Sequence, residues 1–430
     1  MSSPAATASI PSGNTLKSSF LKDVTARGFV HQCTDLQGLD DALCKGPVTG
    51  YVGFDATASS LHVGSLMQIM WLRKLQEHGH KPLVLLGGAT SRIGDPTFKD
   101  TARAQLSEET ITENIEGILY SLKKFLVFGD GPTDAVLVNN KDWVDQLSYT
   151  DFLKDYGPHF TVNRMLSFDS VRLRLEREQP LTFLEFNYMI LQALDYLHLY
   201  KEKGCQLQLG GSDQWGNIVN GTELIRRLGK GQGFGLTSPL VTTASGEKMG
   251  KSVSGALWLN ESHLQPFDFW QFWRNTNDAD VGRFLKIFTS LSLDEIAKIE
   301  ALEGAALNAG KILLADHVTL MTHGASALAQ VHTAIDGTYG GGDDTQGLPE
   351  KQISAIHESA DGFSVVDLLI AAGFVATKGE AKRLILGGGA RINDVPVKEI
   401  DEKVAAICFQ AQPVKISSGK KRHIAMTVSG

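Results

Sequence analysis

Two short stretches of the chain carry side chains suited to holding a polyphosphate. In the first, 59-SSLHVGSL-66, His62 precedes Gly64 and Ser65, and an apolar helical pattern follows. The free amides and the dipole of a helix N-terminus favour a phosphate, and glycine lets the phosphate approach the backbone. The imidazole of His62 can bond a phosphate oxygen. The alternative interpretation is a turn histidine in front of a serine-capped helix.

The second stretch is 245-SGEKMGKS-252, in which Lys248 and Lys251 lie three residues apart on a loop with two glycines. Each ammonium group is a compact point charge that suits a phosphate. Two ammonium groups on one loop can hold a polyphosphate from the same side. Residues 245–252 are called the lysine loop. The alternative is an exposed charged loop, which is the commoner case for such a stretch taken alone.

A carboxylate stands on a predicted helix that is otherwise apolar nearly all round. The helix covers 182-TFLEFNYMILQALDYLHLY-200, and Tyr188, Gln192 and Asp195 fall on one face of it, at i, i+4 and i+7. A buried carboxylate is costly unless it has a partner. The partner is either a polar ligand bound at this face or an internal network of hydrogen bonds.

The elements that must position these side chains alternate along the first half of the chain. Apolar runs predict strands at 50–54, 82–88 and 135–140, and helical patterns predict helices at 64–79 and 108–125. This alternation indicates a parallel α/β sheet, in which ligands gather at the carboxyl ends of the strands. Asp55 and the stretch around His62 follow the first strand, and residues 89–95 follow the second.

A further strand with a glycine-rich turn is predicted at 207-LQLGGSDQWGN-217. The turn carries Asp213 and Gln214, which can grip a ribose or the main chain of a ligand. The alternative is a plain turn.

The composition limits the class of protein. A chain of 430 residues is too long for one compact core, and its 42% hydrophobic and 21% charged residues are typical of globular domains. The four cysteines form neither a Cys-X-X-Cys pair nor a zinc-type cluster, which predicts a reducing, cytoplasmic compartment and no structural metal. No apolar run reaches the roughly 18 residues that a membrane span needs. The small, polar N-terminus predicts a disordered arm rather than a targeting signal.

The charge is unevenly spread along the chain. The net charge is −7, but from Phe363 onward ten Lys and Arg stand against six Asp and Glu, so that this part carries +4 and the rest −11. A basic tail on an acidic body predicts an anionic partner at the tail. Chance asymmetry in a small domain is the alternative.

Together these stretches resemble one family, the bacterial-type tyrosyl-tRNA synthetases of class I. The resemblance runs from about Phe20 to the C-terminus. It rests on YVGFDATASSLHVGSL, GGATSRIGDP, NNKDW, the Tyr188/Gln192/Asp195 face, GGSDQWGN and KMGKS, in this order. Each motif is weak alone, but all six in order make an accidental match very improbable.

The resemblance implies an enzyme that activates L-tyrosine with ATP to tyrosyl-adenylate and pyrophosphate, and then transfers tyrosine to tRNA(Tyr). Magnesium would arrive with the ATP. It also implies a homodimer, because 151-DFLKDYGPHFTVNRML-166 resembles the region around the dimer interface of the family. The segment from Phe363 resembles the S4 RNA-binding domain.

The resemblance assigns roles to residues by their place in the motifs. Its catalytic residues are Thr57, His62, Ser65, Lys248 and Lys251. Tyrosine would be bound by Tyr51, Asp95, Tyr188, Gln192, Asp195 and Gln214, with Tyr51 and Asp195 at the phenol hydroxyl. ATP and the adenylate would contact Gly53, Asp55, His62, Gly64, Gly211, Asp213 and Lys251. Candidate RNA contacts are Lys378, Lys382, Arg383 and Arg391.

The expected fold is a Rossmann-like parallel-sheet catalytic domain, an α-helical domain and a small α+β S4-like domain. The expected boundaries are an N-terminal arm at 1–15, the catalytic domain at 16–240 with a dimer-interface insertion at about 141–180, the lysine loop and anticodon-side helices at 241–336, a linker at 337–362 and the S4-like domain at 363–430.

Two positions depart from the family pattern. Ser65 stands where the second histidine of the first motif usually is, and Gly250 stands where the second motif often has serine. A serine at a helix start can still bond a ribose or a phosphate, so that we expect an active enzyme.

Three competing functions remain. A tryptophanyl enzyme of the same class would not need Tyr51 and Asp195 at a phenol. An RNA-binding or splicing factor that has lost catalysis is favoured only by Ser65. A small-molecule nucleotidyltransferase does not account for the tail domain.

Overall fold

A six-stranded sheet lies at the centre of the first part of the chain. Its strands are β1 (Gln32–Cys33), β2 (Thr49–Phe54), β3 (Lys81–Leu86), β4 (Val136–Asn139), β5 (Cys205–Gly211) and β6 (Phe234–Ser238). Their order is β1-β6-β5-β2-β3-β4, and all neighbours are parallel except β1, which pairs antiparallel with β6 at one edge. The predicted parallel α/β sheet is confirmed.

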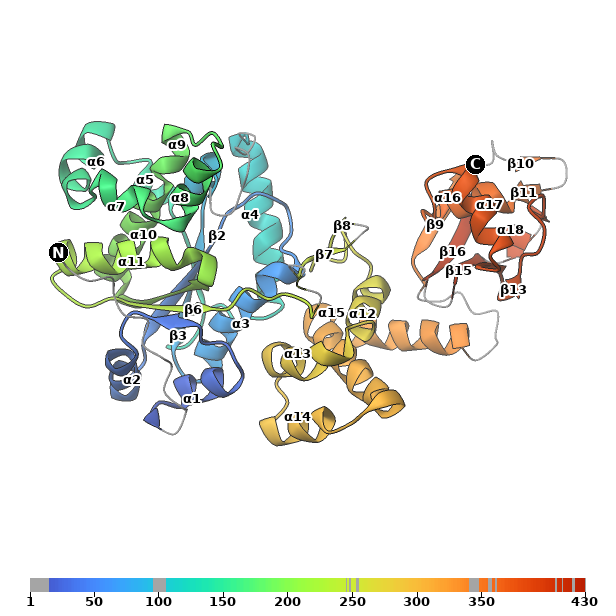
Figure 1. Ribbon diagram of the computed structural model, residues 1–430, viewed down its shortest axis with the longest axis horizontal. Helices are drawn as coiled ribbons and strands as arrows, with labels where there is room; N and C mark the ends of the chain where they lie inside the picture. The colour runs from blue at the N-terminus through green and yellow to red at the C-terminus, as the bar shows by residue number, and fades with distance from the viewer. Residues whose placement is uncertain are drawn as a thin grey trace. The chain divides into compact units, whose positions relative to one another are not determined.

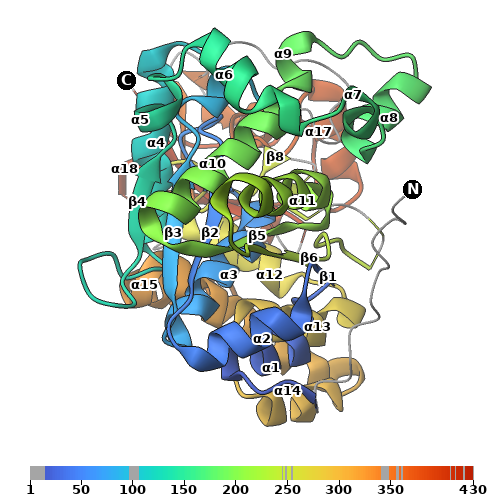
Figure 2. The same ribbon diagram turned by 90° about the vertical axis from the view of Figure 1, so that its left-hand side faces the viewer.

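The central strands are buried on both faces, which explains their continuous apolar runs. Five of the six residues of β3 are buried, and only Gly53 is exposed in β2. Helices α10 (Tyr188–Lys203) and α11 (Trp215–Leu224) cover one face of the sheet, and α3 (Val63–Glu77) packs on the other (Figures 1 and 2). The helices and the sheet thereby hold the ends of β2 and β5 in fixed positions.

The computed structural model describes residues 15–95, 106–244, 246, 249–252, 255–339, 348–354, 358–359, 362–406, 408–411, 413–419 and 422–429. Two compact units emerge. The first comprises Met1–His263 and Asn277–Leu307, and the second comprises Leu264–Thr276 and Asn308–Gly430. The expected N-terminal arm lies outside the described residues apart from Thr15. No helix among the described residues is both long and apolar enough to cross a membrane.

The remaining elements of the first unit surround the sheet. They are α1 (Ser19–Ala26), α2 (Leu36–Lys45), α4 (Glu108–Lys123), α5 (Lys141–Val144), α6 (Tyr149–Asp155), α7 (Val162–Leu166), α8 (Asp169–Glu176), α9 (Phe183–Phe186), the hairpin β7 (Lys251–Ser252) and β8 (Gly255–Ala256), α13 (Val281–Phe288) and α14 (Leu293–Glu300). The sequence placed α13 and α14 in a separate helical domain. They join the first unit because Arg27 donates hydrogen bonds to the carbonyls of Lys286 and Leu291 at the end of α13.

The helix predicted over residues 182–200 is broken into α9 and α10. Thr182 and Glu185 form a capping box that begins α9, and this helix ends at Asn187 after one turn. Tyr188 begins α10, which continues to a left-handed Gly204. The predicted face survives the break, since Tyr188, Gln192 and Asp195 all lie on α10.

The second unit contains two of the helices that follow the lysine loop, α12 (Pro266–Arg274) and α15 (Leu307–Tyr339). Helix α12 packs with α15, and the indole of Trp270 donates to Asp316 over 2.7 Å. Gly324 has φ +82° and ψ +173°, so that α15 consists of two helices that meet at this glycine. Only glycine adopts such a conformation without strain.

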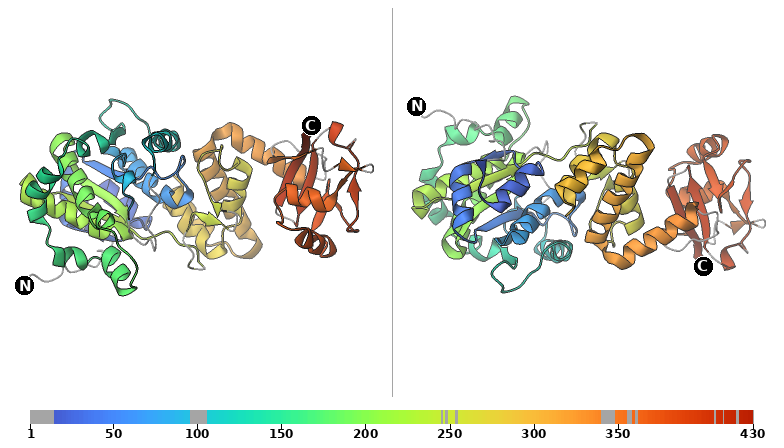
Figure 3. Two further views of the ribbon diagram at one scale, coloured as in Figure 1. Left: turned by 90° about the horizontal axis from the view of Figure 1, so that it is seen from above. Right: turned by 90° about the horizontal axis from the view of Figure 1, so that it is seen from below.

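The C-terminal part of the second unit is an α+β structure. One sheet has the order β13-β12-β15-β16-β9 and a second has the order β10-β11-β14. The strands are β9 (Glu350–Ser354), β10 (Glu358–Ser359), β11 (Gly362–Ser364), β12 (Ala390–Ile392), β13 (Val395–Pro396), β14 (Lys403–Val404), β15 (Val414–Ser418) and β16 (Arg422–Ser429), with helices α16 (Val365–Ala371), α17 (Lys378–Leu386) and α18 (Cys408–Ala411). Figure 3 shows the red strands of the larger sheet side by side.

The observed start of this C-terminal part differs from the expected one. Residues 350–354 fall in the predicted linker, yet they form β9, which pairs parallel with β16. The side chain of Ile353 enters the core around Phe363. The pairing is long-range, and the polar sequence of β9 conceals it. The expected division of the chain into five segments otherwise stays a prediction.

Candidate active site

The predicted site residues meet at the carboxyl ends of β2 and β5. These strands are neighbours in the sheet, but the chain leaves β2 toward β3 and leaves β5 toward β6 on the other side. A crevice forms where the connections diverge, and ligands bind at such points in open α/β sheets. The cleft has a volume of about 620 Å³. It is lined by Tyr51, Gly53, Asp55, Thr57, His62, Gly64, Ser65, Asp95, Tyr188, Gln192, Asp195, Gly211, Asp213 and Gln214.

The base of the cleft contains a carboxylate held by neutral donors. Asp195 is buried, and its two oxygens accept hydrogen bonds from the Asn140 amide, at 3.0 Å, and from the Trp143 indole, at 2.8 Å. The Trp143 ring stacks on His198, with 4.2 Å between ring centroids. The sequence offered a ligand or an internal network as the partner of Asp195. The structure supplies the network and also leaves Asp195 facing the cleft.

A buried tyrosine lies beside this carboxylate. The ring of Tyr51 is 1% exposed, and its hydroxyl has no hydrogen-bond partner among the described residues. Such a group is costly to bury unless a ligand satisfies it. Burial, together with the charge of Asp195, raises the pKa of Tyr51, so that its hydroxyl stays protonated and can donate.

The same burial acts on Asp195. It raises the pKa of this carboxyl to about 7, while the hydrogen bonds from Asn140 and Trp143 act in the opposite direction. The cleft therefore holds a carboxyl that changes its charge near neutral pH. Perturbed groups of this kind in a cleft are typical of functional sites.

The Asn140 amide connects the two sides of the cleft. Its nitrogen also donates to the hydroxyl of Thr90, at 3.1 Å, and Thr90 donates to Asp55 at 3.0 Å. Tyr188 donates to the other oxygen of Asp55 at 3.1 Å. This chain of bonds fixes the side chains between the base of the cleft and the end of β2.

A second network of amides lies at the end of β5. Gln214 donates to Asp95 at 2.8 Å and accepts from Gln192 at 3.3 Å. Asn217 donates to both Gln192 and Gln214, at 3.0 and 3.1 Å. The arrangement presents carboxylate and amide oxygens on one side of the cleft, and these can accept from an ammonium group.

The stretch around His62, residues 59–66, is called the histidine stretch, and its second half forms the start of α3. The helix begins at Val63, with His62 at the N-cap position and Ser65 as its third residue. Ser65 therefore does not occupy the capping position that the alternative interpretation assumed, and it lines the cleft. The backbone amide of Val63 donates to Leu257 at 2.8 Å, and His62 forms a bridge with Trp258. The segment after the lysine loop is thus hydrogen-bonded to the histidine stretch.

The two lysines of the loop are only partly placed. Lys248 lies outside the described residues. The backbone of Lys251 lies in β7, but its side chain is outside the described part of the chain. Their expected contacts with phosphate stay predictions. Thr57 is exposed on the loop after β2 and faces the same cleft.

The candidate RNA contacts lie in the C-terminal part of the second unit. Lys378, Lys382 and Arg383 are exposed on α17, and Lys378 lies 3.3 Å from Asp367. Arg391 differs from them, because it is half-buried and donates to the carbonyl of Asp394 in the turn after β12. This bond gives Arg391 a structural contact as well. Among the described residues, no group of three or more His, Cys, Asp or Glu is placed to hold a metal ion.

The sequence missed four residues that hold the predicted ones in place. They are Thr90, Asn140, Trp143 and Asn217. The NNKDW motif contains Asn140 and Trp143, and it was noticed without being given a role. Its position after β4, at the same edge of the sheet as Asp55, is the signal that could have revealed them.

A comparison with known families accounts for this arrangement. Residues 44–340 match the model of the class I tRNA synthetases of the tryptophan and tyrosine group (tRNA-synt_1b: tRNA synthetases class I, W and Y). The chain belongs to this family.

Within this family, the chain is similar over most of its length to tyrosine–tRNA ligases. The chain is 56% identical to the tyrosine–tRNA ligase of Rhodospirillum rubrum over 412 residues, which cover 96% of this chain and 98% of the relative. It is 54% identical to that of Caulobacter sp. over 406 residues, covering 94% and 97%. A solved structure, the C-terminally truncated mitochondrial tyrosyl-tRNA synthetase of Aspergillus nidulans, matches with a TM-score of 0.67 and 30% identity over 75% of this chain and 95% of that one.

Proposed function

We propose that the chain is a tyrosine–tRNA ligase, which activates tyrosine with ATP and transfers it to tRNA. The observation that carries the substrate assignment is the buried pair of Tyr51 and Asp195 at the base of the cleft. A phenol hydroxyl entering there donates to Asp195 and accepts from Tyr51. Phenylalanine would leave the buried Tyr51 hydroxyl without a partner and would give Asp195 no donor, which costs more than the loss of one contact between exposed groups.

The first step needs no general base from the protein. The tyrosine carboxylate is already ionised, and its oxygen attacks the α-phosphorus of ATP while the bond from that phosphorus to the β-phosphate oxygen breaks. Pyrophosphate leaves, and tyrosyl-adenylate remains. The contribution of the protein is to position the reactants and to stabilise the charge on the phosphates. We assign the phosphate contacts to His62, Thr57, Lys248 and Lys251, and magnesium enters with ATP as part of the substrate.

The amide network at the end of β5 supports an assignment for the ammonium end of the tyrosine. Its ammonium group is held by Asp95, Tyr188 and Gln192, with Gln214 fixing Asp95. Asp55, Gly211 and Asp213 at the ends of β2 and β5 are assigned to the adenylate, with Gly53 and Gly64 allowing its close approach. In the second step, tyrosine passes to the 3′ end of the tRNA and AMP is released.

The direct test is tyrosine-dependent exchange of pyrophosphate into ATP. The expected result is exchange with tyrosine and none above background with phenylalanine or tryptophan. Absence of exchange with tyrosine would overturn the assignment of the reaction. Equal exchange with tryptophan would overturn the assignment of Tyr51 and Asp195 as the phenol-binding pair.

We also propose that the C-terminal part is an S4-like domain that binds tRNA. Its net charge of +4 and the exposed cations of α17 support this. The variant Lys382→Glu/Arg383→Glu should retain pyrophosphate exchange and lose at least tenfold in kcat/KM for tRNA. Lys22→Glu, at an exposed lysine of α1, is the control and should change neither rate. Equal charging by the double variant and the control would contradict the RNA assignment.

A homodimer is proposed from exposed apolar side chains on the insertion and directly after it. Large apolar side chains are exposed along α6 to α9, namely Tyr149, Leu153, Val162, Leu166, Leu175, Phe183 and Leu184. Such a patch is typical of an interface, and a second copy of the chain would cover it. Sedimentation equilibrium should give twice the mass of one chain for the parent. The double variant Val162→Glu/Phe183→Glu should have the mass of a single chain. Val127→Glu, equally exposed but outside the insertion, should leave the dimer intact.

The compartment proposed for this reaction is the cytoplasm. All four cysteines are unpaired, and two of them, Cys44 and Cys408, are exposed. Free exposed thiols are typical of a reducing compartment.

A further inference from the structure

Two glycines from distant parts of the first unit lie against each other beside the cleft. Gly64 is the second residue of α3, and Gly250 follows Met249 in the lysine loop. A β-carbon added to Gly250 would lie 2.7 Å from the backbone nitrogen of Gly64 and 3.0 Å from its α-carbon. A β-carbon added to Gly64 would lie 2.9 Å from the carbonyl oxygen of Met249. Neither position has room for a side chain.

Backbone atoms block both positions, and the ring of His62 lies nearer still to a β-carbon added at Gly64, at 2.7 and 2.8 Å. Flexible side chains could turn away from an added methyl group, but the first turn of α3 cannot move without disturbing the helix. Gly250 also has φ +107°, a conformation that other residues rarely adopt. Both the space and the backbone conformation therefore require glycine at position 250.

Hydrogen bonds hold the two segments at this separation. Met249 donates its amide to Val241 at 2.9 Å, and Gly250 accepts from the amide of Leu257 at 3.1 Å. The carbonyl of Leu257 accepts from Val63 in turn, at 2.8 Å. Gly250 is therefore tied to the start of α3 through Leu257, and Met249 before it is tied to Val241. Lys251 is the next residue along the chain.

We propose that the contact between Gly250 and Gly64 positions the lysine loop on the histidine stretch, and that Gly250 is a positioning residue for adenylate formation. The inference rests on the proposed function and adds a residue to it. The direct contact of the two backbones determines how closely the Lys251 backbone approaches the first turn of α3. A side chain at position 250 would raise this backbone and move it away from the phosphates that lie at the helix start.

This contact also explains the departure at position 250 from a motif that often has serine. In the observed geometry, the serine β-carbon would collide with Gly64. Glycine at this place is thus a requirement of the close packing, and the two positions depend on each other.

The chain offers a matched control in Gly246. This glycine lies in the same loop and has φ +83°, but nothing lies within 4 Å of an added β-carbon. Gly246→Ala and Gly250→Ala both impose an unfavourable backbone conformation, and only Gly250→Ala adds a collision. The comparison of the two variants therefore separates the effect of the collision from the effect of the unfavourable backbone conformation.

The experiment measures tyrosine-dependent pyrophosphate exchange with the full chain and the two variants. Gly250→Ala is expected to lower kcat at least 30-fold, with KM for tyrosine within twofold of the parent. Gly246→Ala is expected to lower kcat no more than about threefold. Gly250→Ser should match Gly250→Ala, because the added β-carbon is common to both.

The double variant Gly64→Ala/Gly250→Ala provides a second measurement. Both changes break one contact, so that the pair should cost no more than about threefold beyond the worse single variant. A loss of kcat in the double variant equal to the product of the two single losses would overturn the proposal.

Equal rates for Gly250→Ala and Gly246→Ala would also overturn it. A rise in KM for tyrosine in Gly250→Ala would likewise contradict it, since the contact acts at the phosphate end alone. A parent chain without tyrosine-dependent exchange would refute the proposed function itself. The two failures are therefore distinguishable.

Discussion

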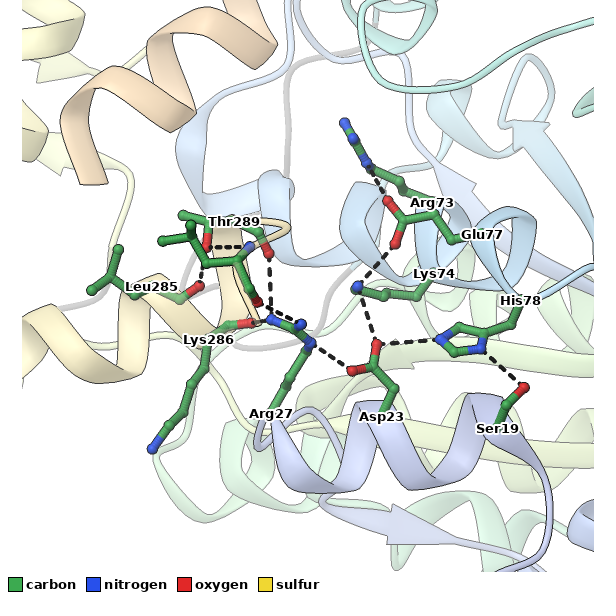
Figure 4. A network of polar contacts seen from close by, with 11 residues as sticks. Ser19, Asp23, Arg27, Arg73, Lys74, Glu77, His78, Leu285, Lys286 and Thr289 are labelled. Carbon is green, nitrogen blue, oxygen red and sulfur yellow. Dashed lines mark hydrogen bonds and ion pairs between the residues drawn. The ribbon is translucent and has the colours of Figure 1, made fainter. Parts of the chain in front are cut away.

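Two carboxylates of the first unit, the buried Asp195 and the half-buried Asp23, have opposite surroundings. Within the described part of the chain, Asp195 accepts hydrogen bonds only from the neutral side chains of Asn140 and Trp143. Asp23 accepts from Arg27 at 2.7 Å, and lies 3.1 Å from Lys74 and 3.2 Å from His78 (Figure 4). The first carboxylate faces the cleft, and the second lies between α1 and α3.

The pKa values follow these surroundings. Burial raises the pKa of Asp195 to about 7, because the neutral donors do not offset it. Burial acts in the same direction on Asp23, but His78, Arg27 and Lys74 outweigh it and hold the pKa of this carboxyl well below its usual range. A carboxylate surrounded by cations is satisfied by the fold, and one held by neutral donors still has capacity for a ligand.

The Asp23 cluster joins three elements of the scaffold. Arg27 reaches the end of α13, Lys74 also pairs with Glu77 at 2.8 Å, and His78 contacts Ser19. Figure 4 shows these side chains converging from α1 and α3. The cluster therefore holds the C-terminal end of the helix whose N-terminal end carries His62. We expect changes at Asp195 to affect activity and changes at Asp23 to affect stability.

The largest effect is expected for Asp195→Ala. The variant loses the acceptor for the phenol hydroxyl, and a hydrogen bond involving a charged group contributes about 1.5–3 kcal/mol. We expect kcat/KM for tyrosine in pyrophosphate exchange to fall about 100-fold. The thermal unfolding temperature should change far less. A variant that binds tyrosine normally would refute the assignment of the pocket.

Asp23→Asn should produce the opposite result. It leaves the buried Arg27 without its counter-charge and Lys74 with Glu77 alone, at a cost of about 2 kcal/mol, below the range for fully buried pairs because Asp23 is partly exposed. Urea unfolding measures this loss, and exchange per folded molecule at low temperature should be unchanged. The control is Asp41→Asn, at the exposed pair with Lys17, which should have no measurable effect. Equal unfolding curves for the two variants would contradict the structural role.

The pH dependence of stability should separate the two carboxyls. The folded chain keeps a proton on Asp195 up to pH of about 7, whereas the unfolded chain releases it near 3.8, so that this group favours folding less as the pH rises between these values. Asp23 acts in the opposite sense, because its contribution is present above pH of about 4 and is lost on acidification.

We therefore expect Asp195→Asn to gain stability relative to the parent between pH 5 and pH 8, by on the order of 2–3 kcal/mol. Urea unfolding of both proteins at the two pH values measures the difference. Parallel stability curves would show that Asp195 is ionised in the folded protein at pH 5.

The smallest effect is expected for Trp143→Phe. The variant removes one neutral donor from Asp195 and retains the ring that stacks on His198, which costs about 1 kcal/mol. This corresponds to about a fivefold fall in kcat/KM for tyrosine. The apparent pKa of the exchange reaction should also rise, because the hydrogen bond from Trp143 opposes the effect of burial. An unchanged pH profile would show that the indole does not act on Asp195.

The strands that position the site could be predicted from local patterns. The apolar runs of β2, β3 and β4 are continuous because both faces of the sheet are covered, and such runs are readable in the sequence. The residues after β2 and β3 were predicted to lie where ligands gather, because the carboxyl ends of parallel strands share an edge. Tyr188, Gln192 and Asp195 kept their common face, since helical spacing is a local property.

The misplaced boundaries share a physical cause. Strand β9 carries one buried apolar residue, Ile353, and it exists because it pairs with β16 more than seventy residues away. Helices α13 and α14 join the first unit through contacts with Arg27 that no local pattern reveals. The break at Asn187 contains neither proline nor glycine, and it follows from the short capped helix before it.

The sequence by itself determined which chemical groups were available and in what order. It established that a carboxylate on an apolar helix needed a partner, and that a histidine and two lysines could serve a polyphosphate. Only the tertiary structure decided which partners met. It brought Asn140 and Trp143 to Asp195, Lys74 and His78 to Asp23, and Gly250 onto Gly64, because contacts between distant segments depend on how the elements pack and not on local spacing.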